Sequence, residues 1–584
     1  MKTTRINKTG WASWGLIVAG LMLLSNLALG QSGRLSHDLE NLPATQAVDV
    51  IVQYRVAPTQ SHFNRVQARG GSLQRELRGM KASAFRLPAS ALQELAADPD
   101  VAYIAPDRPL YSTNNGSPTA VLDYYLGTIN APQAWSQGLD GTGIGVAVID
   151  SGIIDIPDLH GKNYRVVVSQ NFVGGTSGSA NDQYGHGSHV AGVIGGNGNK
   201  STGSNYFYTF KGIAPNVNLI NLRVLDQNGV GTDSQVIAAI NWAITNKAKY
   251  NIRIINLSLG RPVYESYTLD PLCQAVEQAW KAGIVVVVAA GNEGRNNSAN
   301  TSGYGTITAP GNDPYVITVG AMKTMGTSNR ADDQIASYSS KGPTLYDHVV
   351  KPDLAAPGNR VISLYTAGLR MNQLYPGNEI PNSLYQTNGN STASSTYYVL
   401  SGTSMAAPMV SGAAALLLQK SPTLTPDQVK ARLMKTAYKN VVTYSTATDP
   451  STGLTYSGQA DIFAVGAGYL DIQAALSNTD LAPTATGTAL SPTVTRDASG
   501  NVVLVNGSSV VWGTSVVWGT SVVWGTSVVW GTNVSGQSVV WGGSVCWGTS
   551  TMQGYSVVWG TSVVWGTSST PTGEATAIAI NGEN

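Results

Sequence analysis

Five uninterrupted apolar runs limit the possible folds of this chain more than any other feature of its 584 residues. None of them shows the regular apolar–polar alternation of a strand that has one face in water. Strands that are apolar on both sides are buried on both faces, as in a parallel sheet covered by helices. The runs lie between residues 143 and 321, and they are GIGVAVID, NVNLINLRVL, RIINLSLG, IVVVVAAG and YVITVGA.

Helical periodicity lies between these runs. Residues 232–248 place five apolar side chains on one face, and Asp233 can cap the start of that helix. Residues 270–283 begin with Asp-Pro and end with Gly, as a helix does. The alternation over residues 118–478 predicts a doubly wound, mostly parallel α/β domain.

The first 30 residues are typical of a secretory signal peptide. Three basic residues in MKTTRINK precede the apolar run at 15–24, and small residues follow it up to Gly30. An uncleaved membrane anchor is the alternative, but this run is shorter than the ~20 residues that a membrane span needs. We therefore expect a secreted, extracellular protein with no membrane span after signal removal.

The composition argues against partners that bind through charge. The formal net charge is +1 and 12% of the residues are charged, so nothing indicates nucleic acid or an acidic membrane as a partner. The two cysteines, Cys273 and Cys546, cannot form a disulfide framework, and we expect them to be unpaired.

A separate small α+β unit is expected over residues 46–111. Strands are predicted at 48–54, 79–88 and 100–106, and a helix at 91–99 that ends at a proline. The stretch STNNGSP follows, and its composition is typical of an exposed, cleavable linker.

Polar side chains follow two of the apolar runs. Asp150 ends GIGVAVID, and Asn292 follows IVVVVAAG. In an open parallel sheet, ligands and catalytic groups gather at the carboxyl ends of the strands, which makes both residues candidates. Helix capping by the aspartate and turn formation by the asparagine explain either residue equally well when it is taken alone.

Two histidines, His186 and His189, stand three residues apart in YGHGSHVAGVIGG. A zinc site is one interpretation of this spacing, but the HExxH pattern is absent and no third ligand stands out nearby. For His189 we favour a buried, hydrogen-bonded structural role.

Ser404 lies among small residues in SGTSMAAP, residues 401–408, just before an apolar run. A serine hydroxyl becomes a nucleophile only with a base in hydrogen-bond reach and a third group that orients the base. A G-x-S-x-G nucleophile elbow would need glycine at 406, where this chain has alanine, so an α/β-hydrolase esterase fits poorly.

Five blocks taken together resemble the subtilisin family of serine proteases. The blocks are VIDSGI with Asp150, HGSHVAG with His186, NLSLG at 256–260, AAGNEG with Asn292, and SGTSMAAP with Ser404. Their order, Asp then His then Ser, is the order of that family. One departure is Ser188, where the family usually has threonine.

This resemblance implies a secreted serine endopeptidase whose chemistry requires no cofactor. Ser404 would attack the scissile carbonyl, His186 would take and return the proton, and Asp150 would orient the imidazole. Asn292 would donate its side-chain amide to the oxyanion.

The resemblance also implies how a protein or peptide substrate is held. Residues Ser258, Leu259 and Gly260 would pair with extended substrate as a strand. One wall of the pocket for the residue before the cut would consist of Ala289, Ala290 and Gly291. Ordinary sheet packing is the alternative role for these residues.

By the same resemblance, residues 46–111 would be an inhibitory propeptide, a partner that assists folding and then occupies the active site. We expect autocleavage between about 106 and 117, and a permanent structural domain is the alternative. Asp158 matches a position that binds calcium in many relatives, and the loop at 195–204 could add oxygens, so a structural calcium stays open.

A linker is expected over residues 479–500, and repeats of SVVWGT fill residues 501–569 in about ten copies. The even period keeps each residue type on one face of a strand, which predicts a β-rich solenoid or meander with Gly-Thr corners. One interpretation is attachment to a surface or polymer, which makes a surface-binding or adhesive protein the alternative function. The other interpretation of the repeats is a spacer, or a solenoid that binds no ligand.

Overall fold

Two compact units make up the described chain. The computed structural model describes residues 34–40, 42–112, 124–162, 164–174, 178–298, 301–449, 453–496, 502–504 and 583. Unit 1 ends at Asp107 and unit 2 begins at Arg108. The expected signal peptide, and the repeats apart from residues 502–504, lie outside the described residues.

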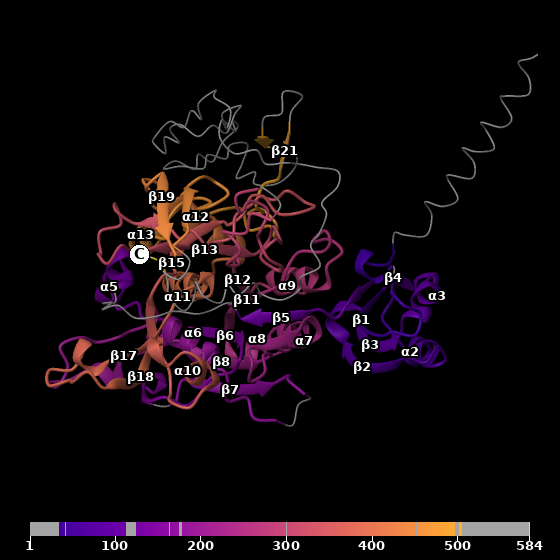
Figure 1. Cartoon of the computed structure of the whole chain (residues 1–584), viewed down its shortest axis with the longest axis horizontal. Coiled ribbons are helices and arrows are strands. Elements are labelled where there is room, and N and C mark those ends of the chain that lie inside the picture. The colour runs from indigo at the N-terminus through magenta and orange to yellow at the C-terminus, as the bar shows by residue number, and fades with distance from the viewer. Residues whose placement is uncertain are drawn as a thin grey trace, which may run out of the picture. The chain divides into compact units, whose positions relative to one another are not determined.

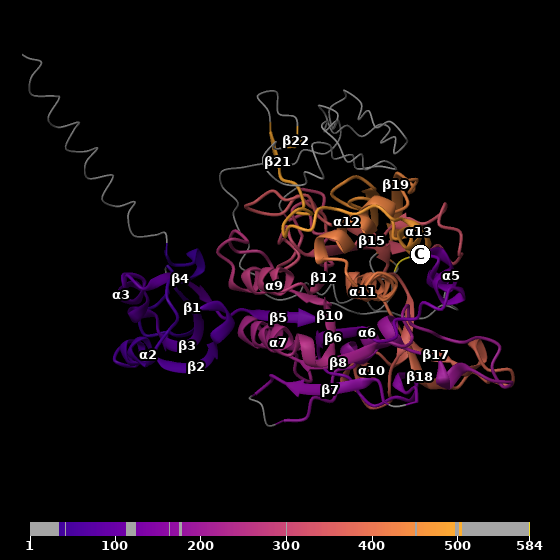
Figure 2. The same ribbon diagram turned by 180° about the vertical axis from the view of Figure 1, so that it is seen from behind.

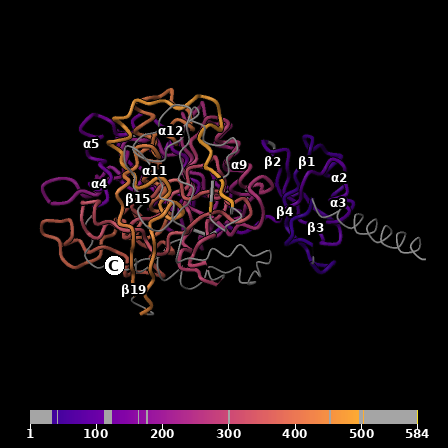
Figure 3. The backbone as a smooth tube through the Cα atoms, turned by 90° about the horizontal axis from the view of Figure 1, so that it is seen from above, coloured from indigo at the N-terminus to yellow at the C-terminus, as the bar shows by residue number. Residues whose placement is uncertain are grey.

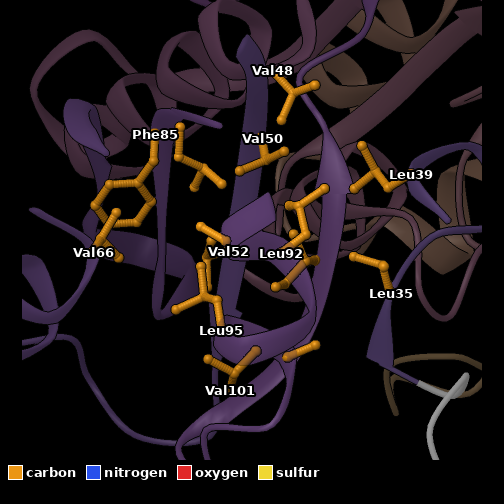
Figure 4. Packing of buried hydrophobic residues seen from close by; sticks show 14 of the residues in the cluster. Leu35, Leu39, Val48, Val50, Val52, Val66, Phe85, Leu92, Leu95 and Val101 are labelled. Carbon is orange, nitrogen blue, oxygen red and sulfur yellow. The ribbon is translucent and has the colours of Figure 1, made fainter. Parts of the chain in front are cut away.

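Unit 1 is a four-stranded antiparallel sheet with the order β2-β3-β1-β4 and two short helices (Figure 1). Its buried core joins Val50 and Val52 to Phe85 and Leu92, as Figure 4 shows. The elements are β1 (Ala47–Tyr54), α2 (Gln60–Gln67), β2 (Ser72–Leu77), β3 (Ala82–Pro88), α3 (Leu92–Ala96) and β4 (Val101–Pro106).

The sequence predicted three of these strands and α3 but missed α2 and β2. Both missed elements are polar and largely exposed: β2 buries one side chain, Leu77, and α2 buries His62 and Val66. Apolar periodicity is therefore weak in both segments, although backbone pairing with β3 and the capping box at Thr59 stabilise them.

Unit 2 is built on an eight-stranded sheet in which all but one pairing is parallel. The five apolar runs form β6, β8, β10, β12 and β13, which confirms the predicted α/β class. The strand order is β14 (Gln334–Ile335), β13 (Ile317–Lys323), β12 (Val285–Ala289), β10 (Ile252–Leu257), β6 (Gly145–Asp150), β8 (Asn218–Arg223) and β7 (Val166–Asn171), with β15 (Leu354–Pro357) also beside β13.

Two pairs of helices pack on this sheet. Helix α11 (Thr403–Lys420) contacts β10, β12 and β13 and lies beside α6 (His186–Gly195), while α7 (Asp233–Thr245) packs against α9 (Pro271–Lys281) (Figure 2). Figure 3 shows α11 beside α12 (Pro426–Thr436) and β15. His186 on α6 and Ser404 on α11, two of the catalytic candidates, therefore lie on helices that pack against each other.

The two predicted helix starts differ in outcome. Asp270 caps α9 as expected, because its carboxylate accepts from the backbone N–H of Leu272 at 2.9 Å. The cap of α7 is Thr232, in a capping box with Gln235, so the expected cap at Asp233 is wrong. The carboxylate of Asp233 instead binds a buried arginine, which local sequence does not reveal.

Part of the expected linker at 479–500 is bound to unit 2. Asp427 accepts backbone hydrogen bonds from Gly487 and Ala489 at 3.1 and 2.8 Å. Ser491 donates to Asp353 at 2.5 Å, and the backbone N–H of Val494 donates to His348 at 2.9 Å. Val494 then begins β21 (Val494–Arg496), which pairs with β22 (Val502–Leu504).

Among the described residues, no helix has both the length and the apolar character that a membrane crossing requires.

The packing of α11 makes a prediction about Gly412. A Cβ at this position would lie 2.5 Å from the Cβ of Ile213. We predict that Gly412→Ala lowers the free energy of unfolding by about 1–3 kcal/mol, because overpacking outweighs the better helix propensity of alanine. Chemical denaturation measures the change, and an unchanged or higher free energy would contradict this packing.

Candidate active site

Asp150 and His186 form a fully buried hydrogen-bonded pair. Asp150 is the last residue of β6 and His186 is the first residue of α6, and Asp150 Oδ1 lies 2.6 Å from His186 Nδ1. A carboxylate only accepts, so Nδ1 carries the proton and Nε2 is the basic nitrogen. Among the described residues Nε2 has no hydrogen-bond partner, so it is ready to accept a proton.

A carboxylate that the sequence analysis missed, Asp182, holds the turn that leads into α6. Its Oδ1 accepts from Ser151 Oγ at 2.9 Å and from the backbone N–H groups of Tyr184 and Gly185 at 3.0 and 2.7 Å. Its Oδ2 accepts from the N–H of Ser188 at 2.9 Å. Burial raises the pKa of Asp182, while these hydrogen bonds favour its ionised form.

The geometry of the same turn explains why residue 187 is glycine. It also shows how Ser188 serves at a position where the subtilisin family usually has threonine. A Cβ on Gly187 would lie 2.2 Å from the carbonyl oxygen of Gly152, so only glycine fits there. The Ser188 hydroxyl accepts from the N–H of Ile154 at 3.1 Å. Serine therefore supplies the hydroxyl that this position uses to hold the segment after Asp150.

Ser404 is the second residue of α11, and a pair of reciprocal hydrogen bonds ties it to Ser258. Ser404 Oγ donates to the carbonyl oxygen of Ser258 at 3.0 Å, and Ser258 Oγ donates to the carbonyl oxygen of Ser404 at 2.9 Å. Because His186 Nε2 makes no hydrogen bond here, proton transfer requires the Ser404 hydroxyl to turn from Ser258 to the imidazole.

Pro408 has a structural role near the start of α11. It lies inside α11, where its missing N–H leaves the carbonyl oxygen four residues earlier without its helical donor. That carbonyl belongs to Ser404, and the Ser258 hydroxyl supplies the donor instead. At this point of α11 a hydrogen bond from Ser258 to Ser404 therefore takes the place of a hydrogen bond within the helix.

The side-chain amide of Asn292 is oriented by Thr403. Asn292 Oδ1 accepts from the N–H of Thr403 at 2.9 Å and from its hydroxyl at 3.0 Å. The N–H of Gly291 in turn donates to Thr403 Oγ at 3.1 Å. Since Oδ1 is the acceptor in these bonds, Nδ2 is the donor end, and it belongs to a side chain held beside the residue that precedes Ser404.

The predicted substrate strand pairs with a segment of this chain. Strand β5 (Pro109–Ser112) lies between β11 (Leu259–Gly260) and β9 (Val230–Thr232), antiparallel to both. Figure 1 shows β5 beside β11. Its register places Ser112 opposite Leu259 and Tyr111 opposite Gly260. The two flanking strands thus form a slot that holds one extended peptide.

A buried ion-pair cluster joins the two sides of this slot. Arg261, directly after β11, binds Asp233, directly after β9, at 3.0 Å, and it binds Asp270 at 2.8 Å. Burial alone would lower the pKa of Arg261, but the two carboxylates raise it well above its ordinary value. Arg261 therefore stays charged and fixes the distance between β9 and β11.

The other predicted pocket residues are packed in the sheet. Ala289 and Ala290 are buried, and the backbone of Ala290 bonds to Val319 and Thr308. A Cβ on Gly291 would lie 2.7 Å from Thr308 Cγ2, and Gly291 has a φ of +105°. These contacts are those of sheet packing, so their contact with substrate stays a prediction.

The surroundings of Asp158 do not fit a calcium site. Its Oδ2 accepts from Tyr397 Oη and its Oδ1 from the N–H of Lys200, both at 2.6 Å, while its carbonyl oxygen accepts from Arg165 at 2.8 Å. Burial raises the pKa of Asp158, which disfavours the anion that a cation needs. Within the described chain, no group of three or more His, Cys, Asp or Glu side chains could hold a metal.

His189 has the structural role expected for it. Its side chain is buried, and Nε2 lies 3.2 and 3.1 Å from the carbonyl oxygens of Val361 and Tyr398. Burial lowers its pKa to about 3, with a contribution from the neighbouring charge of His186. His189 is therefore neutral near pH 7 and donates from Nε2.

Comparisons with known proteins identify the family of the chain. Residues 141–468 match the Subtilase family. Subtilisin E of Bacillus subtilis (strain 168) is 34% identical over 411 residues, which are 70% of this chain and 84% of that protein. Serine protease AprX of the same strain is 39% identical over 308 residues, 51% of this chain, and the match spans only 62% of AprX.

A solved structure shares the fold. Fervidolysin from Fervidobacterium pennivorans, a keratinolytic enzyme related to subtilisin, superposes with a TM-score of 0.54 at 24% sequence identity. The superposition covers 80% of this chain and 66% of that one.

The role of Asp182 is testable by Asp182→Asn. The amide places an NH₂ group against backbone N–H donors, so the turn into α6 must shift and carry His186 with it. We predict that kcat falls about tenfold or more, with KM changed by less than about twofold. Steady-state kinetics on a chromogenic peptide gives both constants. A kcat equal to that of Asp155→Asn, a control at an exposed carboxylate that pairs with His160, would contradict the prediction.

Proposed function

The chain belongs to the subtilase family of serine endopeptidases, and on that premise we propose that it is a secreted endopeptidase made as a self-processing zymogen. The observation that carries the proposal is the Asp150–His186 pair at 2.6 Å, whose imidazole keeps Nε2 for the proton of a nucleophile. Ser404, Asn292 and the slot between β9 and β11 supply the other parts of a peptidase.

The reaction begins when Ser404 Oγ attacks the carbonyl carbon of the scissile peptide bond. His186 Nε2 takes the hydroxyl proton and returns it to the leaving amine, and Asp150 holds the imidazole in the tautomer that allows both steps. Asp150 stays ionised and stabilises the imidazolium that forms between them. Water then releases the acyl group by the same proton transfers in reverse order.

Two donors serve the oxyanion of the tetrahedral intermediate. Asn292 supplies Nδ2, because its Oδ1 is engaged by Thr403. The second donor is the backbone N–H of Ser404, in the first turn of α11, where N–H groups have no partner within the helix. The positive end of this 18-residue helix adds to the stabilisation of the negative charge.

The placement of β5 supports zymogen processing by this site. Ser404 Oγ lies 3.0 Å from the carbonyl oxygen of Ser258, so the residue opposite Ser258 is the one next to the nucleophile. Leu259 pairs with Ser112, the last described residue of this segment, and in the sequence Ser258 precedes Leu259 just as Thr113 follows Ser112. Thr113 lies outside the described residues. We infer that the bond after Thr113 is the processed bond, within the range expected from the sequence.

The same register bears on substrate preference. Leu110 stands four positions before the cut if Thr113 is the last residue of the released propeptide. Its side chain is fully buried, with an exposed fraction of 0%. Burial of such a side chain contributes about 1.5–3 kcal/mol to binding. Substrates with a large apolar residue at this position are therefore favoured.

The alternative function, adhesion through the repeats, has no support from the described residues. The repeats lie outside them apart from residues 502–504. Secretion is supported by the pattern of the first 30 residues, and residues 46–107 are the part of unit 1 proposed as propeptide.

Processing by Ser404 makes a prediction about the mature protein. The secreted parent protein should hydrolyse casein and begin at Asn114, as N-terminal sequencing would show. Ser404→Ala should lose casein hydrolysis and keep the Thr113–Asn114 bond intact. Processing of the Ser404→Ala protein at the same rate, in a host without other secreted peptidases, would contradict self-cleavage.

The preference at Leu110 can be measured with two peptides. Leu-Tyr-Ser-Thr and Asp-Tyr-Ser-Thr, each with a chromogenic amide after threonine, differ only at the position of Leu110. We predict a kcat/KM at least about tenfold lower for the aspartyl peptide, since a charged group would enter an apolar site. Equal values for the two peptides would exclude this position as a specificity determinant.

A further inference from the structure

Glu583, which follows the repeats in the sequence, has its carboxylate buried in unit 2. The exposed fraction of the residue is 2%. Oε2 accepts from Arg295 Nη2 at 3.0 Å and from the Ser337 hydroxyl. Oε1 accepts from the N–H of Ser337 at 2.7 Å and lies 3.7 Å from Lys323 Nζ. Four donor groups on three residues thus surround one carboxylate.

The backbone of Glu583 is held as well. Asn359 Nδ2 donates to the carbonyl oxygen of Glu583 at 2.8 Å, and the N–H of Glu583 donates to Asn359 Oδ1 at 3.0 Å. One asparagine side chain therefore binds both polar groups of the same residue. A site that engages both the side chain and the main chain of a glutamate selects a peptide segment rather than a free anion.

Two buried cations, Arg295 and Lys323, form ion pairs with Glu583. Arg295 and Lys323 are both buried, and Arg295 also pairs with Asp449 at 3.2 Å and stacks on the ring of Tyr456. Burial lowers the pKa of Lys323, and the charge of Glu583 opposes this effect. Glu583 therefore places a carboxylate beside both buried cations, which favours burial of all three groups.

Two residues of this pocket, Arg295 and Asn359, belong to chain segments that also contact or contain parts of the proposed active site. Arg295 lies three residues after Asn292, in the loop that follows β12. Asn359 follows Gly358, whose carbonyl oxygen accepts from the N–H of Gly402 at 2.7 Å. The N–H of Arg360 donates to Ser401 Oγ at 2.9 Å. Glu583 binds Arg295 through its carboxylate and the Asn359 side chain through its own backbone, so it links the loop of the oxyanion donor to the segment that contacts residues 401 and 402.

We propose that the pocket of Arg295, Lys323, Ser337 and Asn359 is a docking site for Glu583, and that Glu583 stays bound there in the active enzyme. Glu583 acts as a positioning residue: it acts on catalysis through Asn292 and Ser404 and does not touch substrate. The catalytic consequence rests on the proposed peptidase function, whereas the docking itself does not. The segment after the repeats thus remains on the mature protein.

The test compares Glu583→Gln with Glu574→Gln in the full-length secreted protein. Glu574 is the other glutamate that follows the repeats, so it is the matched control. We predict that Glu583→Gln lowers kcat about fivefold or more with little change in KM, while Glu574→Gln leaves both constants like the parent. Adding the peptide IAINGEN, residues 578–584, should restore kcat, and IAINGQN should not.

The unfolding temperature of the variants and the mass of the mature enzyme test the docking of Glu583 independently of the proposed peptidase function. In the Ser404→Ala background, which needs no activity, Glu583→Gln should lower the unfolding temperature relative to Glu574→Gln, and the mass of the active parent enzyme should include residue 583. Equal kcat and equal unfolding temperatures for the two variants, or a fully active form that ends before residue 583, would overturn the proposal.

A second variant covers the case in which Glu583→Gln is secreted too poorly to assay. Asn359→Ala removes both backbone bonds to Glu583 and leaves the buried charges in place. The proposal expects a lower kcat and a lower unfolding temperature for this variant too. Parent-like values for both would overturn it.

Discussion

A carboxylate with no exposure to water, at the end of a strand buried on both faces, is the constraint on which the proposed site depends. Asp150 must satisfy its charge with protein donors, since a buried and unpaired carboxylate is strongly unfavourable. Its Oδ1 accepts from the N–H of Ser151 at 2.7 Å and from His186 Nδ1 at 2.6 Å. Pairing of the carboxylate therefore fixes the tautomer of the histidine, and with it the nitrogen that can act as a base.

The nucleophile and the substrate slot depend on a second exchange of hydrogen bonds. Pro408 denies the carbonyl oxygen of Ser404 its helical donor, and Ser258 replaces that donor. The start of α11 is thus tied to the strand that pairs with peptide, and Arg261 ties that strand to β9 through Asp233. Small shifts of the substrate slot are coupled in this way to the position of Ser404.

The parallel sheet and two of the candidate site residues could be predicted from sequence because they follow from local sequence patterns. The apolar runs gave the parallel sheet, and the positions of Asp150 and Asn292 after two of them made these residues candidates. The roles of Asp182, Arg261 and Glu583 arise from pairings that only the folded chain brings together, so no periodicity marks them. Asp182 had a usable signal: it is a lone carboxylate in a glycine-rich stretch four residues before His186. The resemblance suggested calcium at Asp158, but in the folded chain its carboxylate oxygens accept hydrogen bonds from Tyr397 and Lys200, which local sequence does not reveal.

The central claim is that Ser404 is a nucleophile activated by His186 and Asp150. Labelling of the mature protein with a fluorophosphonate, followed by peptide mass mapping, tests it most directly, because such reagents modify only a serine that a neighbouring base activates. We expect one label per molecule, on Ser404, with loss of casein hydrolysis in proportion to labelling, and no label in His186→Ala. Labelling of a different serine, or full hydrolysis by protein that is completely labelled on Ser404, would contradict it.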